Sequence, residues 1–458
     1  MTSDSDPEGA ARRGEYRRRW YLLDNIARLF PPIVSPRYTT LFRVSARLTT
    51  PVISEALSRA LALAWRRFPQ FQVHLRRGVF WHYLEACDPG PPEADLGMPC
   101  TEFPRYRRER PLLRVLVRGR RIAVETTHIL TDGTGALEFL RALLVAYALE
   151  AGATHREGEA VVPHDEALVS DARHLGVAVP GDPLAPEEEE YASRRFYERR
   201  LPHPVEYSPA WHLPGPRLRA GVYHVTTVRY ETAALRERAR SLEVSLTDFL
   251  LAVFILSLQE AYAAAAEPRR HRRPIRIMVP VNMRPHTGSR TMRNFFVVVL
   301  VEVDQRLGTY SLDEIARKVH HQLRAELDPR GLRRQITRNV RAERSAVIRV
   351  MPVFIKDVIL QVAHHLQGER VNTASFSNLG QVGLPAGVAG MVESFDFLPP
   401  PSASTGVNMT VISSGTVASI SFGSSLRDHD VERRVIETLS GLGLPGTLRT
   451  NWKYQAGV

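Results

Sequence analysis

A histidine and an aspartate four residues apart form the pattern in this chain that is best suited to chemistry. They stand in the stretch THILTDGTG, residues 127–135, as His128 and Asp132, and Gly133 follows directly. Imidazole titrates close to neutral pH, so His128 is a candidate general base. Asp132 could orient the turn or meet a cation instead of touching the imidazole. A buried structural histidine before an ordinary Asp-Gly turn is the alternative.

The residues around this stretch predict a strand that is followed by a helix. Residues 112–129 have the pattern of a hairpin with its turn near Gly119, and residues 135–152 are helix formers that end at a glycine. Gly133 and Gly135 allow a sharp turn between the strand and the helix. The histidine therefore falls at the end of a predicted strand.

Predicted strands and helices alternate on both sides of a segment that is rich in proline and glycine. We expect strands or hairpins at 38–48, 71–85, 275–283, 295–303 and in the last ninety residues, and helices at 52–68, 246–259, 312–327, 347–366 and 429–441. This mixture predicts an α/β (α+β) fold. We place an N-terminal subdomain at 1–200, a linker at 201–221 and a C-terminal subdomain at 222–458.

The composition is that of a globular protein with a basic excess. The chain has 458 residues, 61 Lys and Arg against 49 Asp and Glu, and a net charge of +12. Such a charge attracts polyanions, including nucleic acid, anionic lipid and nucleotide phosphates. The basic residues are spread along the chain without a nucleic-acid-binding motif, so a bias of composition is the alternative and no nucleic-acid partner is expected.

Cysteine content and apolar runs bear on the compartment. Cys87 and Cys100 are too few for a disulfide framework, and no Cys or His set has the spacing of a metal site, so we expect a cytoplasmic protein without a metal. The first residues lack the apolar region of a signal peptide. The apolar runs at 246–259 and 347–363 could meet a membrane surface, but a buried core explains both more simply. No integral membrane segment is predicted.

Other segments extend the pattern around His128 to nearly the whole chain. They are VPVNMRP at 279–285, MRNFF at 292–296, SFSNLG at 375–380, LDNIARLFPPIVSPRYTTLF at 23–42 and FPQFQVHLRRGVFWHYLE at 68–85. With the His-x-x-x-Asp-Gly stretch they resemble the superfamily of thioester-dependent acyltransferases that includes chloramphenicol acetyltransferase and condensation domains. The likeness is greatest to bacterial proteins of the alcohol acetyltransferase type.

The resemblance implies a fold and a division of roles around the motif. In that superfamily two chloramphenicol-acetyltransferase-like subdomains meet at a central tunnel, and the motif histidine, here His128, is the general base. Asp132, Gly133 and Arg284 match structural residues of the site, and the aspartate and arginine form an ion pair. Many members have a second histidine where this chain has Thr127, but the catalytic one is kept.

The resemblance also implies an activity, namely transfer of an acyl group, with acetyl as one candidate, from acyl-CoA to a small-molecule alcohol or amine. Asn282, Ser377 and Asn378 match segments near the tunnel and are candidates for substrate binding or oxyanion stabilisation. Acyl-CoA is then a co-substrate, and no bound cofactor is expected. Two alternatives remain: a condensation-type enzyme that uses a carrier-protein thioester, and a non-catalytic binding member of the fold. The Arg-rich segment 331–344 could bind coenzyme A phosphates or an acidic carrier protein, or be a solvated helix face.

Overall fold

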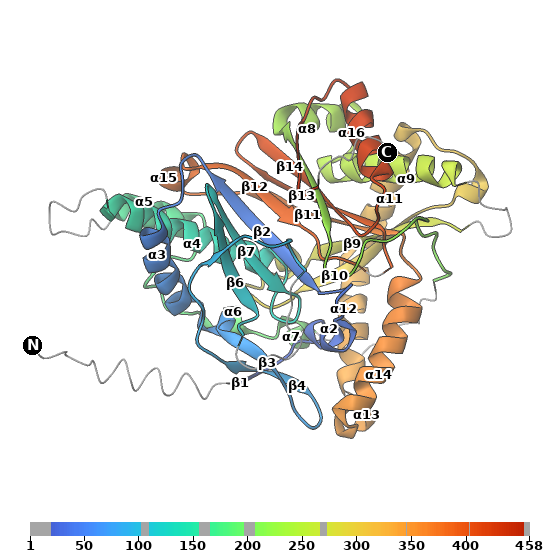
Figure 1. The fold of residues 1–458 in the computed structure, drawn as a ribbon. Coiled ribbons are helices and arrows are strands. Elements are labelled where there is room, and N and C mark those ends of the chain that lie inside the picture. The colour runs from blue at the N-terminus through green and yellow to red at the C-terminus, as the bar shows by residue number, and fades with distance from the viewer. Residues whose placement is uncertain are drawn as a thin grey trace, which may run out of the picture.

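Two β-sheets, one built mainly from each half of the chain, organise the fold. The structure is a computed structural model that describes residues 20–101, 110–154, 165–196, 207–265, 273–344, 346–402 and 404–452. Strands and helices alternate along both halves, as Figure 1 shows, so the α/β class expected from the sequence is confirmed. Helices of each half pack against their own sheet and enclose a separate apolar core.

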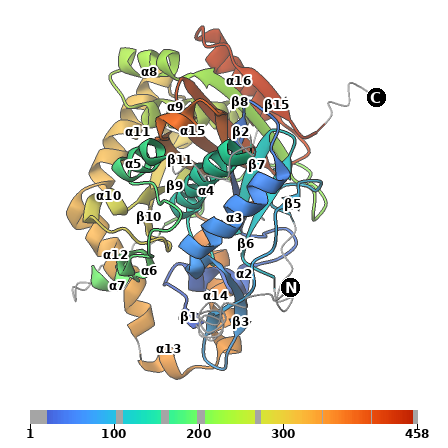
Figure 2. The same ribbon diagram turned by 90° about the vertical axis from the view of Figure 1, so that its left-hand side faces the viewer.

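The first sheet has five strands in the order β12, β2, β7, β6 and β5. Its strands from the first half are β2 (Leu41–Leu48), β5 (Glu93–Ala94), β6 (Leu113–Arg118) and β7 (Arg121–Thr127). Helices α3 (Ser54–Arg67) and α4 (Gly133–Thr154) pack on each other and on this sheet, as the second view shows (Figure 2). A separate small sheet joins β1 (Trp20–Leu22), β4 (His82–Ala86) and β3 (Val73–Arg77).

The second sheet has seven strands in the order β10, β9, β11, β13, β14, β8 and β15. Their bounds are β8 (His224–Glu231), β9 (Ile275–Asn282), β10 (Phe296–Val303), β11 (Ala374–Val382), β13 (Val407–Ser414), β14 (Val417–Ser424) and β15 (Thr447–Thr450). Helices α8 (Thr232–Ser241), α9 (Leu246–Ala264), α11 (Leu312–Glu326) and α16 (Asp430–Gly441) contribute to its core. The shorter helices are α2 (Phe30–Ile33), α5 (Glu166–His174), α6 (Pro186–Glu189), α7 (Ala192–Arg195), α10 (Arg284–Thr287) and α15 (Ala386–Ala389).

The longest apolar run forms α9, which lies inside the second half as expected. Ser245 and Asp248 exchange side-chain and backbone hydrogen bonds at 3.1 Å, so the helix starts with a capping box. Helix α9 is long and apolar enough to cross a bilayer by composition alone, but most of it is buried in the core. A helix that is apolar on all sides is typical of the buried core of a large protein.

One strand crosses from the second half of the chain to the first sheet. Strand β12 (Val392–Leu398) pairs antiparallel with β2, although its residues fall in the segment that we assigned to the C-terminal subdomain. Asp396 on β12 accepts hydrogen bonds from Arg229 on β8 at 2.7 and 2.8 Å, which ties the two sheets together. The first sheet is therefore completed by residues far along the chain. Of the linker at 201–221, residues 201–206 lie outside the described ones.

The single helix expected at 347–366 is wrong. Pro352 divides this segment into α13 (Ala346–Val350) and α14 (Val353–Ala363), and a π-helical turn follows at His364–Glu369. Proline has no N–H for the helix ladder and clashes with the preceding turn, so the chain restarts there. The expectation that these apolar residues are core is also wrong, because most of those on α14 are exposed.

Two glycines at the start of α4 are required by close approach and not by a left-handed backbone. Neither Gly133 nor Gly135 has a positive φ, so glycine's conformational freedom does not explain them. A Cβ on Gly135 would lie 2.1 Å from Thr131 Oγ1 and 2.7 Å from the carbonyl oxygen of Met292, and one on Gly133 would lie 2.9 Å from Leu379. Because Met292 and Leu379 belong to the second half, these glycines let the halves meet.

Substitution of Gly135 tests this contact. We expect Gly135→Ala to lower the free energy of unfolding by about 1–3 kcal/mol, because the Met292 carbonyl is backbone and cannot move aside cheaply. Gly152→Ala in the same helix meets open space and should instead raise it by about 0.5–1 kcal/mol. Urea unfolding of the two variants measures both values, and equal effects would contradict the close approach.

Candidate active site

His128 is the first residue after β7 and sits among aromatic rings from both halves. Its ring stacks on Phe30 at 5.2 Å between centroids, and it also lies 4.6 Å from Phe42 and 5.8 Å from Phe296. Phe30 belongs to α2 and Phe42 to β2, whereas Phe296 begins β10 of the second half. The histidine is neither fully buried nor fully exposed. The ring is thus held in a largely apolar surround.

The side chain of Asn294 fixes the orientation and the tautomer of this imidazole. Its amide nitrogen donates to the backbone oxygen of His128 at 2.9 Å and to Asp24 Oδ2 at 3.1 Å, so its oxygen must face Nδ1 of the ring, 3.3 Å away. An amide oxygen can only accept a hydrogen bond, which places the ring proton on Nδ1. The lone pair of the neutral ring is then on Nε2, where a base needs it.

Burial lowers the pKa of His128 below the usual histidine value. The contact with Asn294, the charge of Asp132 and the backbone of Thr131 act in the opposite direction, but they do not outweigh the loss of hydration. Asp24 at the far side of Asn294 is also buried, and burial raises the pKa of its carboxyl. At neutral pH His128 is therefore uncharged and able to accept a proton.

Asp132 and Arg284 form the ion pair that the resemblance implies. Arg284 Nη1 lies 2.9 Å from Asp132 Oδ2, and Nη2 lies 3.0 Å from Oδ1, in the two-pronged geometry that a guanidinium offers a carboxylate. The aspartate also accepts the N–H of Gly135 at 3.0 Å, which caps α4, and the N–H of Phe295 at 2.9 Å. Asp132 thus joins the motif stretch to the second half in three places.

Arg284 uses its remaining donors on nearby backbone and on Asn282. Its Nε donates to the carbonyl of Thr291 at 2.8 Å and its Nη2 to the carbonyl of Arg293 at 2.7 Å. The side-chain oxygen of Asn282 accepts both the N–H and Nη1 of Arg284. Asn282, a candidate for substrate binding, therefore has its oxygen committed to holding the arginine.

Thr127, which replaces the first histidine of many similar motifs, has a structural partner. Its hydroxyl lies 2.7 Å from the hydroxyl of Thr40, and both residues are fully buried. Thr127 Oγ1 also accepts the N–H of Ile129 at 3.3 Å, within the turn that carries His128. The substitution therefore leaves a satisfied polar contact in front of the base.

The other two candidates, Ser377 and Asn378, lie on β11 and point to opposite sides. The amide of Asn378 donates to Thr247 at the start of α9, and its oxygen accepts the N–H of Gly380. Ser377 alternates with Phe376, which is buried in the second core, so its hydroxyl is on the other face of the sheet. That face also carries Leu379, which approaches Gly133. Ser377 thus faces the first half, and Asn378 does not.

The face of the second sheet that looks toward the first half is partly exposed and mostly apolar. On β10 the buried residues alternate with half-buried ones, and Phe296, which touches His128, belongs to the half-buried set. The same holds for Met278 and Pro280 on the paired strand β9. Solvent therefore reaches this face, in contrast to the tightly buried face under α9.

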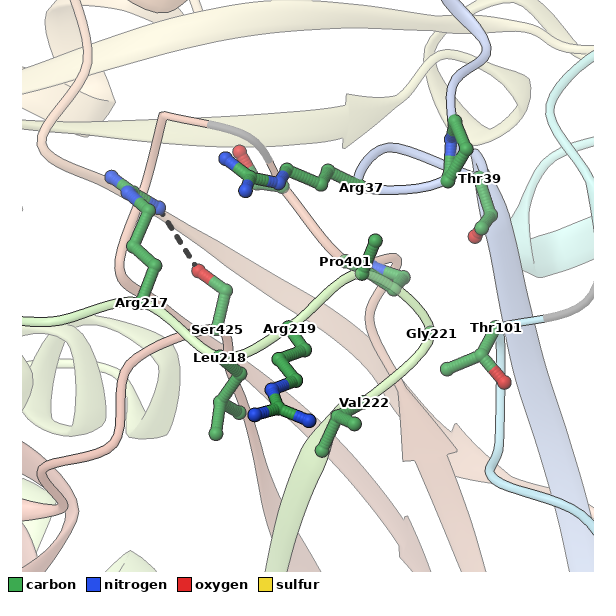
Figure 3. Close-up of a pocket in the computed structure, with 13 residues that line it drawn as sticks. Arg37, Thr39, Thr101, Arg217, Leu218, Arg219, Gly221, Val222, Pro401 and Ser425 are labelled. Atoms are coloured by element: carbon green, nitrogen blue, oxygen red, sulfur yellow. Dashed lines mark hydrogen bonds between the residues drawn. The ribbon is translucent and has the colours of Figure 1, made fainter.

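One pocket is lined by residues of both halves of the chain (Figure 3). The first half supplies Arg37, Thr39 and Thr101, and the second half supplies residues 217–222, 401, 402 and 425. Thr39 precedes the threonine that contacts Thr127. Arg217 is held by hydrogen bonds to Ser425 Oγ and a backbone carbonyl. Arg37, Arg217 and Arg219 line this pocket and no Asp or Glu among the described residues does, which gives it a charge suited to an anion such as a phosphate.

The cysteines have the environments of structural thiols. Cys100 is fully buried, and burial raises the pKa of its thiol well above the usual value. Burial also raises the pKa of Cys87 to about 12. A thiol must ionise to act as a nucleophile, so neither residue is suited to forming an acyl-enzyme at neutral pH.

No family model and no curated protein sequence matches the chain. Its fold is similar to that of the first condensation domain of the calcium-dependent antibiotic synthetase, with a TM-score of 0.57 at 14% identity over 92% of this chain and 95% of that one. It is also similar to TRI101 of F. graminearum in complex with coenzyme A and deoxynivalenol, with a TM-score of 0.57 at 13% identity over 93% and 99%.

The chain has the fold that these condensation domains and acetyltransferases share. A third likeness is to the TRI3 trichothecene 15-O-acetyltransferase of Fusarium sporotrichioides, with a TM-score of 0.56 at 10% identity over 92% of this chain and 96% of that one. The expectation of two chloramphenicol-acetyltransferase-like subdomains is confirmed by these structures at the level of the fold. These likenesses concern the fold. The roles proposed for individual residues rest on the distances and contacts of this chain.

The sequence pattern did not single out Asn294 and Asp24, two residues of the candidate site. Both lie inside segments that contributed to the resemblance, MRNFF and LDNIARLF. Their roles depend on a contact between residues 270 positions apart, at 3.1 Å. A single sequence has no signal for such a contact beyond the presence of a polar residue in an apolar segment.

The Asp132–Arg284 pair predicts strong energetic coupling. Asp132→Ala and Arg284→Ala should each lower the free energy of unfolding by about 3–5 kcal/mol, because each leaves a buried charge without its partner. The double variant should cost clearly less than the sum of the two. The exposed pair Arg433–Glu437 is the control and should couple by only about 0.5 kcal/mol. Additive losses at Asp132 and Arg284 in urea unfolding would contradict the pairing.

Asn294 is expected to act as a positioning residue for the base. Asn294→Ala should lower kcat by about tenfold or more, since Nδ1 loses its acceptor, and should move the acid limb of the pH–rate profile to lower pH. Asn451 is a matched control, because its amide also bridges two backbone groups, of Val225 and Tyr223. Asn451→Ala should leave the profile unchanged. If the pH–rate profile of Asn294→Ala does not shift, Asn294 contributes only packing and does not position the imidazole.

Proposed function

We propose that the protein is an acyltransferase that moves an acyl group from an acyl-CoA thioester to an alcohol or amine, with His128 as the general base. The observation that carries this proposal is the neutral imidazole whose Nδ1 faces Asn294 and whose Nε2 keeps its lone pair. It is supported by the fold, because TRI101 has been solved with coenzyme A together with a small molecule. The acceptor is a small molecule, and acetyl is one possible acyl group.

The chemistry uses one proton and no covalent enzyme intermediate. An alcohol or amine is a weak nucleophile at neutral pH until a base takes its proton. His128 Nε2 takes that proton as the acceptor oxygen or nitrogen attacks the thioester carbonyl and a tetrahedral oxyanion forms. The intermediate collapses by breaking the carbon–sulfur bond, and the imidazolium returns the proton to the departing thiolate. No resident metal or cofactor takes part in this sequence.

We assign different roles to the other candidate residues of the site. Ser377 is the proposed oxyanion donor, because its hydroxyl is on the sheet face that looks toward the first half. Asn378 and Asn282 are proposed to hold the backbone, since the first bonds Thr247 and Gly380 and the second bonds Arg284. Asp132, with Gly133 and Arg284, is proposed to keep the turn in place.

A carrier-protein thioester is the second candidate donor. The likeness to a condensation domain solved with a substrate analogue favours it, as does the basic character of the chain. The two donors carry the acyl group on the same kind of thioester, which belongs to coenzyme A in one case and to a carrier protein in the other. The two donors can be compared by their transfer rates. If acyl-CoA donates its acyl group as fast as an acylated carrier protein does, no carrier protein is required. The third possibility, a binding protein without catalysis, predicts no thiol release from any acyl-CoA.

His128→Ala tests the proposed base. Thiol release from acyl-CoA in the presence of mixed alcohols and amines should fall by about 10²–10⁴-fold, with an unchanged urea midpoint. His321→Ala, an exposed histidine on α11, is the matched control and should keep full activity.

The pH dependence gives a further check on the same residue. Because burial lowers the pKa of His128, activity should rise through a midpoint below pH 6.5, the usual histidine value, and be flat near neutrality. Full activity in His128→Ala would contradict the assignment of His128 as the base.

A further inference from the structure

Helix α14 presents its apolar side to solvent and its polar side to the protein. Phe354, Val358, Ile359 and Val362 are 50–59% exposed, and Ile355 beside them is 38% exposed. These positions recur every three or four residues and form one stripe along the helix. An ordinary surface helix of a folded protein has the reverse arrangement, with its apolar stripe against the core.

The polar residues of α14 are used for internal contacts. Lys356 is buried, and its ammonium donates to the carbonyl of Phe80 at 2.8 Å and lies 3.3 Å from the centroid of the Trp81 ring. Asp357 is directed at His82, with 3.1 Å between oxygen and nitrogen. Gln361 donates to the carbonyl of Pro32 in α2. The helix is therefore held to the protein by its charges, and its orientation is fixed.

The apolar stripe continues onto neighbouring segments. The tip of the β3–β4 hairpin carries Val79 and Phe80, which are 71% and 48% exposed, and Val79 accepts the N–H of Val353. Val350 at the end of α13 is 70% exposed. Figures 1 and 2 both place the hairpin and α13 at one end of the molecule. We call the exposed residues of α13, α14 and the hairpin tip the apolar end; they are Val79, Phe80, Val350, Phe354, Ile355, Val358, Ile359 and Val362.

The charges around the apolar end are basic or already paired. Arg349 is exposed beside Val350, and Arg77 is half exposed at the base of the hairpin tip. Asp357, the carboxylate of α14, is only 16% exposed and lies 3.7 Å from Arg77 in addition to its contact with His82. The chain as a whole carries a charge of +12. An anionic surface would therefore meet attraction here, because Asp357, the carboxylate of α14, is already paired with Arg77 and His82.

We infer that the apolar end is a membrane-docking surface that binds the surface of a bilayer containing anionic phospholipid. An apolar stripe with a basic border is the chemistry by which a helix lies in the headgroup region of a bilayer. The stripe and the hairpin tip are protruding elements, as suits insertion into a lipid surface. A folded protein partner or a second copy of this chain is a different occupant, and the experiment below separates these outcomes.

The same end of the molecule lies next to the candidate base. Gln361 of α14 holds α2, and Phe30 at the start of α2 stacks on His128. Leu29, directly before Phe30, is 47% exposed. A bilayer bound at the apolar end would therefore lie against the segment that forms one wall of the site. The inference concerns binding and holds whether or not the chain is an acyltransferase.

Vesicle binding by the full chain tests the inference. Vesicles of phosphatidylcholine mixed with phosphatidylglycerol should retain the protein in a flotation assay, and vesicles of phosphatidylcholine alone should retain it less. High salt should weaken binding to the vesicles that contain phosphatidylglycerol, and the binding that remains should come from the apolar contacts. The double variant Phe354→Glu/Val358→Glu should lose at least about tenfold in partitioning, because it places two carboxylates against the lipid.

Matched variants keep the result interpretable. Leu96 and Leu307 are 85% and 75% exposed elsewhere on the chain, so Leu96→Glu/Leu307→Glu adds the same charge away from the apolar end and should bind vesicles as the wild type does. His128→Ala should also bind normally. Absence of vesicle binding by the wild type, or normal binding by Phe354→Glu/Val358→Glu, overturns the inference. So does a wild-type dimer that this variant converts to a monomer without any vesicle binding.

Discussion

The buried carboxylate of Asp132 is the constraint on which the arrangement of the two halves depends. It accepts two hydrogen bonds from Arg284, one from the N–H of Phe295 and one from the N–H of Gly135. A carboxylate removed from water is stable only when such partners satisfy it. Three of these four bonds come from the second half of the chain. The charge of one side chain therefore sets where the start of α4 lies against β10.

The position of His128, the proposed base, follows from the same contact. The bond from Asp132 to the N–H of Phe295 fixes the residue before it, Asn294, beside the turn that carries His128. Asn294 then orients the imidazole through Nδ1, while its other donor reaches Asp24 near the start of the chain. The site is thus assembled from three segments that are far apart in sequence. The same contacts therefore set both the geometry of the site and the orientation of the imidazole.

What a single sequence can predict is set by how local the physical cause is. The hairpin at Gly119 depends on neighbouring residues, and it was predicted. The pairing of β12 with β2 was not, because an alternating strand fits either sheet equally well. The site shows the same limit. The resemblance pointed to His128 and Arg284, whereas the role of Asn294 depends on a fold contact that no local pattern records.

Helix α14 shows why amphipathic periodicity alone does not tell which side faces the core. Its sequence has an apolar side and a polar side, and the usual assumption buries the first. Here the polar side is buried because its partners are inside: a backbone carbonyl and an aromatic ring for Lys356, and His82 for Asp357. Those contacts hold the hairpin, and Gln361 holds α2, whose Phe30 touches the base. The outward apolar stripe is therefore the other side of a helix whose polar groups support the site.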